Sequence, residues 1–156
     1  MTDYALLCAQ TASLAEGCRK PLPLLANAAA LLWETLPDVN WAGFYLLSGD
    51  ELLLGPFQGK IACTCIRLGC GVCGTAARTR QTQRVEDVHA FPGHIACDPA
   101  SRSELVIPLL LPSGRLLGVL DLDSAFPARF TREDEDGLQT FVHALLACAD
   151  WDAGLI

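Results

Sequence analysis

The sequence lacks any apolar stretch long enough to cross a bilayer. The longest, residues 22–33, contains 12 residues including Pro23 and Asn27, whereas a membrane helix needs about 20 apolar residues in succession. The N-terminus also lacks the basic start and the small-residue cleavage site of a secretory signal. We therefore expect a cytoplasmic protein that does not span a membrane.

Positive charge is also scarce. The chain has 11 Lys and Arg against 18 Asp and Glu, which gives a formal net charge of −7 at pH 7. Binding to nucleic acid depends on a high density of Lys and Arg, so this balance argues against DNA or RNA as a partner. No basic amphipathic segment favours a membrane surface either. The charge excludes these classes of partner without indicating a ligand.

Length and composition indicate one ordered domain over residues 1–156. Hydrophobic residues make up 51% and charged residues 19% of the chain, which excludes disorder. A chain of this size buries roughly 70% of its unfolded surface, so it can fold without a disulfide or a metal. No internal repeat or linker divides it. We expect helices over 1–37, a sheet with its loops over 40–124 and a helix over 131–150.

Hydrophobic periodicity predicts the helices. The first helix is expected to stop near Gly17, and a short helix is expected over 71–80. The second helix should end before Pro37, and its apolar side chains recur at positions 24, 25, 28, 31 and 32. Thr131 is a candidate N-cap for the last helix, with Asp134 three residues further on.

The middle of the chain is typical of strands and turns. Two apolar runs, Leu105–Leu111 and Leu116–Leu122, are joined by a Pro-Ser-Gly turn and should form an antiparallel pair of central strands. The order of helices, antiparallel sheet and helix predicts an α+β fold. We expect the long irregular segment 87–103 to carry function. Further strands are predicted over 40–47, 51–54, 61–67 and 83–85, the first two as a hairpin.

Cysteine is abundant, with eight residues in the chain. In a cytosolic protein such clustering indicates metal or redox chemistry rather than a disulfide framework. Residues 63–73 read CTCIRLGCGVC, and three interpretations stay open: buried packing residues, redox thiols or a zinc site. The zinc ligands would be Cys63, Cys65, Cys70 and Cys73. However, a C-x-C pair four residues before a C-x-x-C pair is not the usual zinc spacing.

Cys97 is the candidate nucleophile because it lies in the long irregular segment, close in sequence to His89 and His94. A reactive cysteine must be accessible and must ionise near neutral pH, and a nearby histidine favours its ionisation. The alternative is that His94 is an ordinary solvated loop residue.

Three carboxylates and two aromatic residues are candidates for a pocket. Asp121 and Asp123 share one face of an apolar strand by alternation, while Glu104 begins the neighbouring strand. A strand-end ion pair or a capping role is the simpler interpretation. Clustered carboxylates, however, raise one another's pKa and can supply a general acid at neutral pH. Trp41 and Tyr45 also share a strand face, and form either core or an apolar wall for a small ligand.

Seven sequence blocks carry a specific family resemblance. They are NWAGFYLL (40–47), GPFQGKIAC (55–63), GVCGTA (71–76), VEDVHAFPGHIACD (85–98), SELVIPL (103–109), GVLDLDS (118–124) and RFTREDEDGL (129–138). In these blocks the chain resembles the free methionine-(R)-sulfoxide reductases, which are single GAF domains. Cys63, Cys73 and Cys97 keep the family's spacing of 10 and 24 residues.

The resemblance implies a thiol-dependent oxidoreductase that reduces free methionine (R)-sulfoxide to methionine. Cys97 would be the catalytic cysteine and would pass through a sulfenic acid. Cys63 would be the main resolving cysteine, and Cys73 a second recycling cysteine. Thioredoxin would reduce the resulting disulfide, no metal or organic cofactor would be needed, and a homodimer would be common. The alternative function is a non-catalytic GAF-type sensor of a small ligand.

The resemblance also implies the composition of the pocket. Glu104, Asp121 and Asp123 would bind the substrate and assist proton transfer. Trp41 and Tyr45 would surround the methyl–sulfur end of the substrate. The implied fold is GAF-like, with a six-stranded antiparallel sheet and helices packed on it.

Five cysteines fall outside the three-cysteine pattern of the family. Cys65 and Cys70 leave open a side disulfide or adventitious metal binding. Cys8, Cys18 and Cys148 fall on predicted helices and are expected to be packing residues.

Overall fold

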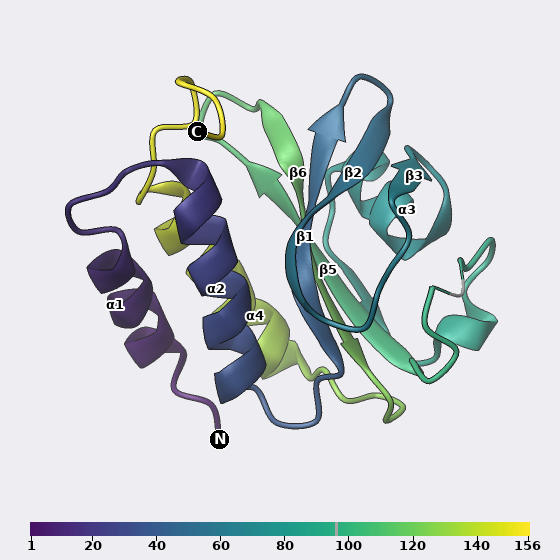
Figure 1. Cartoon of the computed structure of the whole chain (residues 1–156). Helices are drawn as coiled ribbons and strands as arrows, with labels where there is room; N and C mark the ends of the chain where they lie inside the picture. The colour runs from purple at the N-terminus through teal and green to yellow at the C-terminus, as the bar shows by residue number, and fades with distance from the viewer. Residues whose placement is uncertain (96) are drawn as a thin grey trace.

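The chain folds around one six-stranded antiparallel sheet (Figure 1), and the computed structural model describes residues 1–95 and 97–156. The strand order is β3-β2-β1-β6-β5-β4, which confirms the α+β prediction and places β5 and β6 inside the sheet. The strands are β1 (Trp41–Ser48), β2 (Glu51–Gly59), β3 (Cys65–Arg67), β4 (Gln83–Val85), β5 (Ser103–Leu110) and β6 (Leu116–Ser124). The helices are α1 (Tyr4–Leu14), α2 (Pro21–Thr35), α3 (Gly71–Thr79) and α4 (Arg132–Leu146), with a 3-10 turn, η1 (Val88–Ala90).

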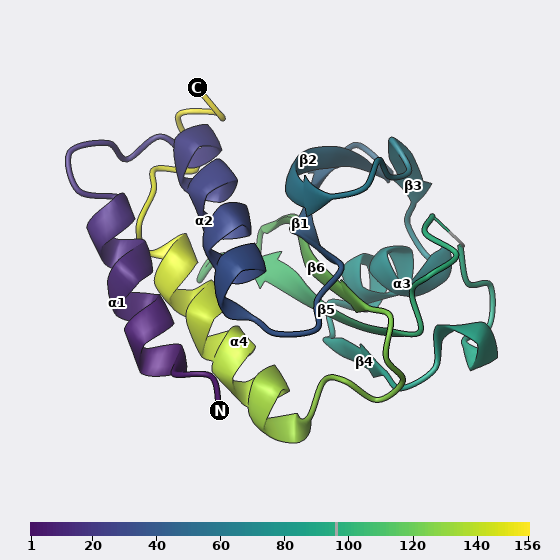
Figure 2. The same ribbon diagram turned by 60° about the horizontal axis from the view of Figure 1, so that its bottom comes forward.

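Three helices cover one face of the sheet. α2 and α4 pack against the strands, and α1 lies outside them against α4 (Figures 1 and 2). The core between these layers is apolar, and Leu25, Leu120, Leu122 and Phe141 are fully buried in it. Burying each such side chain contributes roughly 1.5–3 kcal/mol, so this layer is a main source of stability. Within the described part of the chain, no helix is both long and apolar enough to span a membrane.

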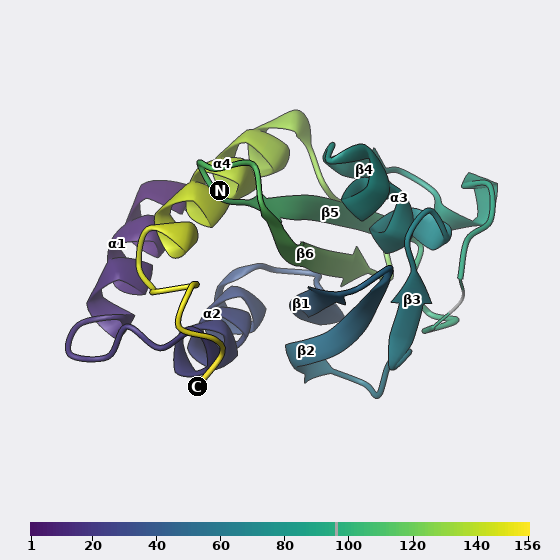
Figure 3. The ribbon, with the colours of Figure 1, turned by 90° about the horizontal axis from the view of Figure 1, so that it is seen from above.

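The opposite face of the sheet is covered by α3 and by the loops on either side of it (Figure 3). Side chains alternate across a strand, so the residues of β6 divide between the two faces. Leu120 and Leu122 point into the helix-covered core, whereas Asp121 and Asp123 line a cavity on the α3 side. The candidate site lies on this second face.

Local sequence signals explain where several elements begin and how closely strands approach. α4 starts with a capping box, in which Thr131 accepts a hydrogen bond from the Asp134 N–H and Asp134 accepts one from the Thr131 N–H. The predicted N-cap is therefore confirmed. α2 begins at Pro21, where the missing N–H has no helical partner to lose. A side chain at Gly118 would meet the Tyr45 carbonyl, so glycine lets β6 approach β1 closely.

Two strand predictions differ from the structure. β2 continues to Gly59 rather than ending at Leu54, because its second half follows β1 past a register shift between Gly43 and Tyr45. Local propensity missed this extension because Gly55 and Pro56 interrupt the apolar pattern. The third strand covers only Cys65–Arg67 rather than 61–67.

The helical cysteines also differ from prediction. α1 ends at Leu14, and Cys18 lies beyond it as an exposed residue, so the packing role predicted for Cys18 is wrong. Cys8 and Cys148 are half-buried against the helix-covered core, as expected of packing residues.

Candidate active site

A small cavity lies on the second face of the sheet. Its volume is about 40 Å³, which is room for about three water molecules. Strands β1, β5 and β6, helix α3 and the loops before β3 and β5 contribute its walls. The predicted site residues in this lining are Trp41, Tyr45, Cys73, Cys97, Glu104, Asp121 and Asp123.

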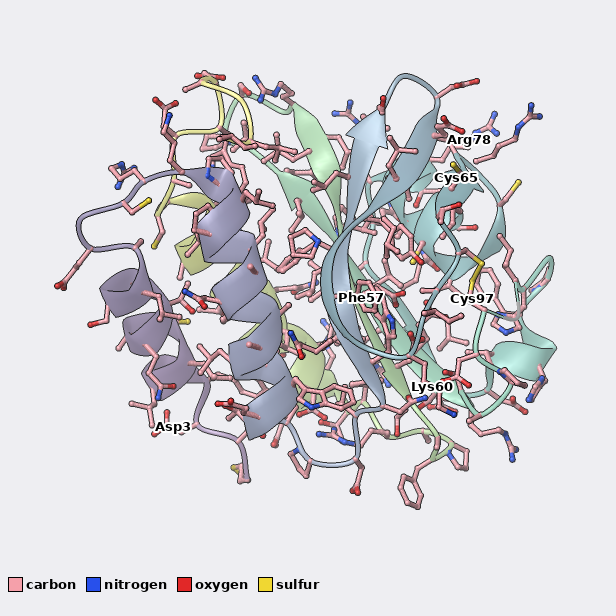
Figure 4. The ribbon with its side chains drawn as sticks, in the orientation of Figure 1. Asp3, Phe57, Lys60, Cys65, Arg78 and Cys97 are labelled. Carbon is pink, nitrogen blue, oxygen red and sulfur yellow. A yellow bond between two sulfur atoms is a disulfide. The ribbon has the colours of Figure 1, made fainter. Side chains whose placement is uncertain are left out.

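A disulfide joins Cys63 to Cys97 at the edge of this cavity (Figure 4). The two Cα atoms are 5.7 Å apart, although 34 positions separate the residues in sequence. Cys63 lies in the connection from β2 to β3, and Cys97 lies between η1 and β5. The fold therefore brings two distant loops together at one pair of sulfur atoms.

Cys73 takes a different position from Cys63. It is a buried residue of α3, and its Sγ donates a hydrogen bond of 3.7 Å to Glu104 Oε1. Burial, followed by the charges of Asp121 and Glu104, raises the pKa of the Cys73 thiol well above its ordinary value. Cys73 is therefore a buried thiol that ionises less readily than a free cysteine.

The three predicted carboxylates form one cluster. Glu104 on β5 pairs in register with Asp123 on β6, and Asp121 follows one alternation along the same face. Burial raises the pKa of Glu104 and Asp123 well above their ordinary values, and the charge of Asp121 adds to both shifts. Burial also raises the pKa of Asp121, while Glu104 and Cys73, as hydrogen-bond donors, act in the opposite sense. The carboxyl groups of the cluster, above all Glu104 and Asp123, therefore keep their protons to a higher pH than free carboxyl groups do.

Stacked aromatic rings form the wall above these carboxylates. The ring centroids of Trp41 and Tyr45 lie 5.7 Å apart, and those of Trp41 and Phe57 lie 5.1 Å apart. Gly43 permits this stack, because a side chain there would collide with Phe57 and with the Trp41 ring. The Tyr45 hydroxyl donates to the Cys63 carbonyl at 3.0 Å, which ties the wall to the disulfide loop.

A hydrogen-bonded clamp holds the chain just after Cys97, and the sequence did not reveal it. Asn40 Nδ2 donates to Asp98 Oδ2 at 3.0 Å and to Ser101 Oγ at 3.3 Å. Asp98 Oδ1 in turn accepts the Ala100 N–H at 2.9 Å. Asn40 and Asp98 stand in two of the blocks that carry the resemblance, which was the available signal for this clamp.

The two histidines near Cys97 are placed differently from each other. His94 lines the cavity, and burial together with the nearby His89 lowers its pKa, so it is neutral at pH 7. His89 is exposed, with its ring centroid 6.2 Å from that of His94.

The fold brings all eight predicted site residues to one place, but it separates the four cysteines of the 63–73 segment. Cys65 and Cys70 are exposed, Cys73 is buried and Cys63 is bonded to Cys97. Figure 4 shows Cys65 on a part of the chain apart from the Cys97 disulfide. Among the residues that the structure describes, these four cysteines form no common metal site. The cavity also receives apolar side chains that sequence reasoning did not name, including Ile61, Ile66, Val72 and Ile95.

This geometry suits two-electron thiol chemistry. A cysteine pair that forms a disulfide stands beside proton-holding carboxylic acids and an apolar aromatic wall. The acids can protonate an oxygen atom that leaves a substrate, and the wall can accommodate its apolar end.

Comparisons with known proteins agree with this chemistry. A profile of the GAF domain matches residues 24–146. The free methionine-R-sulfoxide reductase of Escherichia coli (strain K12) is 59% identical over 133 residues, covering 83% of this chain and 80% of that protein. The free methionine-R-sulfoxide reductase of Saccharomyces cerevisiae is 48% identical over 122 residues, covering 74% of this chain and 68% of that protein. The X-ray structure of free methionine-R-sulfoxide reductase from Neisseria meningitidis in complex with its substrate has a TM-score of 0.88 at 43% identity, covering 93% of this chain and 87% of that one.

Proposed function

The chain belongs to the GAF-domain family of free methionine-(R)-sulfoxide reductases, and we propose that it reduces free methionine (R)-sulfoxide with Cys97 as the nucleophile. The observation that carries this proposal is the Cys63–Cys97 disulfide at the edge of a cavity that also contains Glu104, Asp121 and Asp123. A disulfide in this position is the product expected after one turnover of a thiol reductase.

In the first step the Cys97 thiolate attacks the sulfoxide sulfur. Glu104, whose pKa is raised by burial, protonates the sulfoxide oxygen, because that oxygen would otherwise become an anion in a poorly solvated pocket. The substrate S–O bond breaks, methionine leaves and the oxygen remains on Cys97 as a sulfenic acid. Cys97 is oxidised by two electrons and the substrate sulfur is reduced by two.

The carboxylates also give the substrate an orientation. Its ammonium group pairs with the remaining negative charge of Asp121 or Asp123. Its methyl–sulfur end packs against Trp41 and Tyr45, which form the apolar wall. The ammonium partly offsets the negative charge of the pocket, so bound substrate favours the Cys97 thiolate.

In the second step the Cys63 thiol attacks the sulfenic sulfur of Cys97, which forms the disulfide and releases water. The Cα separation of 5.7 Å in the disulfide form is within the usual range for such a bond. Cys73 is buried, and its thiol donates a hydrogen bond to Glu104. The proposed resolving cysteine is therefore Cys63, and Cys73 would act only in a later thiol–disulfide exchange.

An external dithiol completes the cycle, and thioredoxin is the proposed reductant. It attacks the Cys63–Cys97 disulfide, passes through a mixed disulfide and leaves both cysteines reduced. Such a cycle requires a reducing compartment, so the proposed location is the cytoplasm.

The disulfide must be reduced before the next turnover, because its Cys97 sulfur cannot act as a thiolate nucleophile. The cavity beside the disulfide is small, at about 40 Å³.

A stoichiometric turnover assay tests this function. Reduced protein is mixed with resolved R and S free sulfoxides, without further reductant, and methionine is quantified by chromatography. Wild type should consume the R form, and Cys97→Ser should form no methionine. Cys63→Ser should complete the first turnover in this assay, but should fail to cycle when thioredoxin is added in a second assay. Cys18→Ser serves as a remote control. Full methionine formation by Cys97→Ser would overturn the assignment, and binding without turnover in wild type would favour the sensor function.

A homodimer is the proposed assembly, as is common among the family's members. Sedimentation velocity of the reduced and the disulfide forms tests it, and a single species at the mass of one chain would contradict it.

A further inference from the structure

The floor of the cavity contains a second arrangement of ligand atoms, separate from the disulfide. Cys73 Sγ, one carboxylate oxygen of Glu104 and one of Asp121 all lie within 4.8 Å of one another. The three residues are buried, and they come from α3, β5 and β6. Three packed secondary-structure elements thus fix the positions of three potential metal ligands.

One carboxylate oxygen of Asp121 lacks a hydrogen-bond partner within the described part of the chain. Asp121 is 5% exposed, and its Oδ1 has no hydrogen-bond partner among the residues that the structure describes. A buried carboxylate oxygen without a partner is costly. A divalent cation would satisfy this oxygen and balance the charge of its carboxylate.

The distance between the Cys73 sulfur and the Glu104 oxygen is close to that in a tetrahedral zinc site. Zn–S bonds of about 2.3 Å and Zn–O bonds of about 2.1 Å at the tetrahedral angle place sulfur and oxygen about 3.6 Å apart. The observed distance from Cys73 Sγ to Glu104 Oε1 is 3.7 Å. Asp123 lines the same cavity as these three residues and could supply a fourth ligand.

The donor set selects the type of cation. Mg²⁺ and Ca²⁺ prefer oxygen ligands only and in larger number, whereas one thiolate with two carboxylates suits Zn²⁺. We propose that Cys73, Glu104 and Asp121 form a binding site for Zn²⁺, and that the bound ion inhibits the enzyme. On binding, the proton of the Cys73 thiol and any proton carried by Glu104 or Asp121 are released to solvent.

Inhibition follows from the position of the ion, and this part rests on the proposed function. Glu104 bound to the ion would have no proton to give to the sulfoxide oxygen, and the charge of the ion would repel the substrate ammonium. Binding itself does not depend on the reductase activity. It also does not need Cys63 or Cys97, which remain joined as a disulfide.

The test uses the disulfide form, in which Cys63 and Cys97 cannot bind metal. Co²⁺ alone is titrated anaerobically, and thiolate-to-cobalt charge-transfer absorption in the near ultraviolet is recorded. Zn²⁺ is then added and should abolish this absorption, because Zn²⁺ binds such sites more tightly than Co²⁺. Cys65→Ser, which removes an exposed thiol of the same segment, should leave the signal unchanged.

Two variants decide the outcome. Removing a residue that only hydrogen-bonds to a metal ligand weakens metal binding about 10–100-fold. Cys73→Ser removes a ligand itself, so it should raise the Kd for Zn²⁺ at least about 100-fold. Asp121→Asn keeps the thiol and the side-chain volume, and should weaken Zn²⁺ binding at least about tenfold even if Cys73→Ser does not fold. The proposal is overturned if wild type shows no charge-transfer absorption, if Asp121→Asn binds like wild type, or if Cys65→Ser abolishes the signal. The turnover assay is run with a metal chelator, so its result does not depend on this one.

Discussion

The two faces of the sheet show opposite uses of the same strands. On the helix-covered face, Leu105, Leu120 and Leu122 are fully buried among apolar side chains of α2 and α4. On the other face, Asp121 and Asp123, from the same stretch of β6, surround a cavity with Glu104. Burial raises the pKa of these carboxyl groups. The apolar face supplies stability, which allows the other face to retain buried acids.

An acidic side chain placed in the helix-covered face should cause the greatest loss of stability. Leu122→Asp would bury a carboxyl group without donors in the helix-covered core, and should reduce the free energy of unfolding by at least about 4 kcal/mol. Urea denaturation followed by circular dichroism measures this loss. Leu122→Met is the matched control, and should cost less than about 1.5 kcal/mol. Wild-type stability in Leu122→Asp would show that the two faces are not functionally divided.

Removing a carboxyl group from the cavity should mainly slow catalysis and should not unfold the protein. Glu104→Gln removes the proposed proton donor with little change of shape, and should slow single-turnover methionine formation about 10²–10⁴-fold. Glu86→Gln, which alters an exposed carboxylate, is the control. A Glu104→Gln rate within about twofold of wild type would assign the proton transfer to another acid of the cluster, since general-acid catalysis contributes far more than that.

The pH dependence of stability should differ between wild type and Glu104→Gln. The folded-state pKa of Glu104 lies above its ordinary value of 4.5, so the folded protein binds more protons than the unfolded chain above that pH. Wild type should therefore lose stability as the pH rises from 4.5 through the raised pKa. Glu104→Gln should lose less stability over this range, because it has no carboxyl group to ionise at this position. The two losses should differ by about 1.4 kcal/mol for each pH unit that separates the folded-state and unfolded-state pKa values of Glu104. Denaturation midpoints across this range measure the difference, and parallel curves for the two proteins would contradict it.

The smallest expected effect concerns the clamp beside Cys97. Asn40→Ala removes hydrogen bonds to Asp98 and Ser101, at a cost of about 1 kcal/mol. Amide hydrogen exchange in residues 98–101 should become about fivefold faster, which is the rate equivalent of that free energy. Asn27→Ala, on the exposed side of α2, is the control. Unchanged exchange in Asn40→Ala would show that other contacts hold this loop.

Sequence patterns predicted the elements whose signals are local. The periodicity of α2, the Thr131 cap and the alternation of leucine with aspartate in β6 are confirmed, because each depends on neighbours within one element. The ends of β2 and β3 were missed, because long-range pairing with β1 and the position of the disulfide loop determine them.

The candidate site was predictable to a similar degree. Residue types and the family resemblance named the residues that meet at the cavity, although residue reasoning alone left zinc, packing and redox roles open for Cys63 and Cys73. The hydrogen bond from Cys73 to Glu104 and the clamp formed by Asn40 depend on positions 31 and 58 residues apart. No local pattern encodes such contacts, so they required the structure.

The alternating side chains of β6 also protect the fold against misalignment. If β6 shifted by one residue along β1, Asp121 and Asp123 would enter the apolar core and Leu120 and Leu122 would fill the cavity. The same shift would move Gly118 away from the Tyr45 carbonyl and bring a bulkier residue against it. The acids of the cavity therefore also help the chain to select its correct strand alignment while it folds.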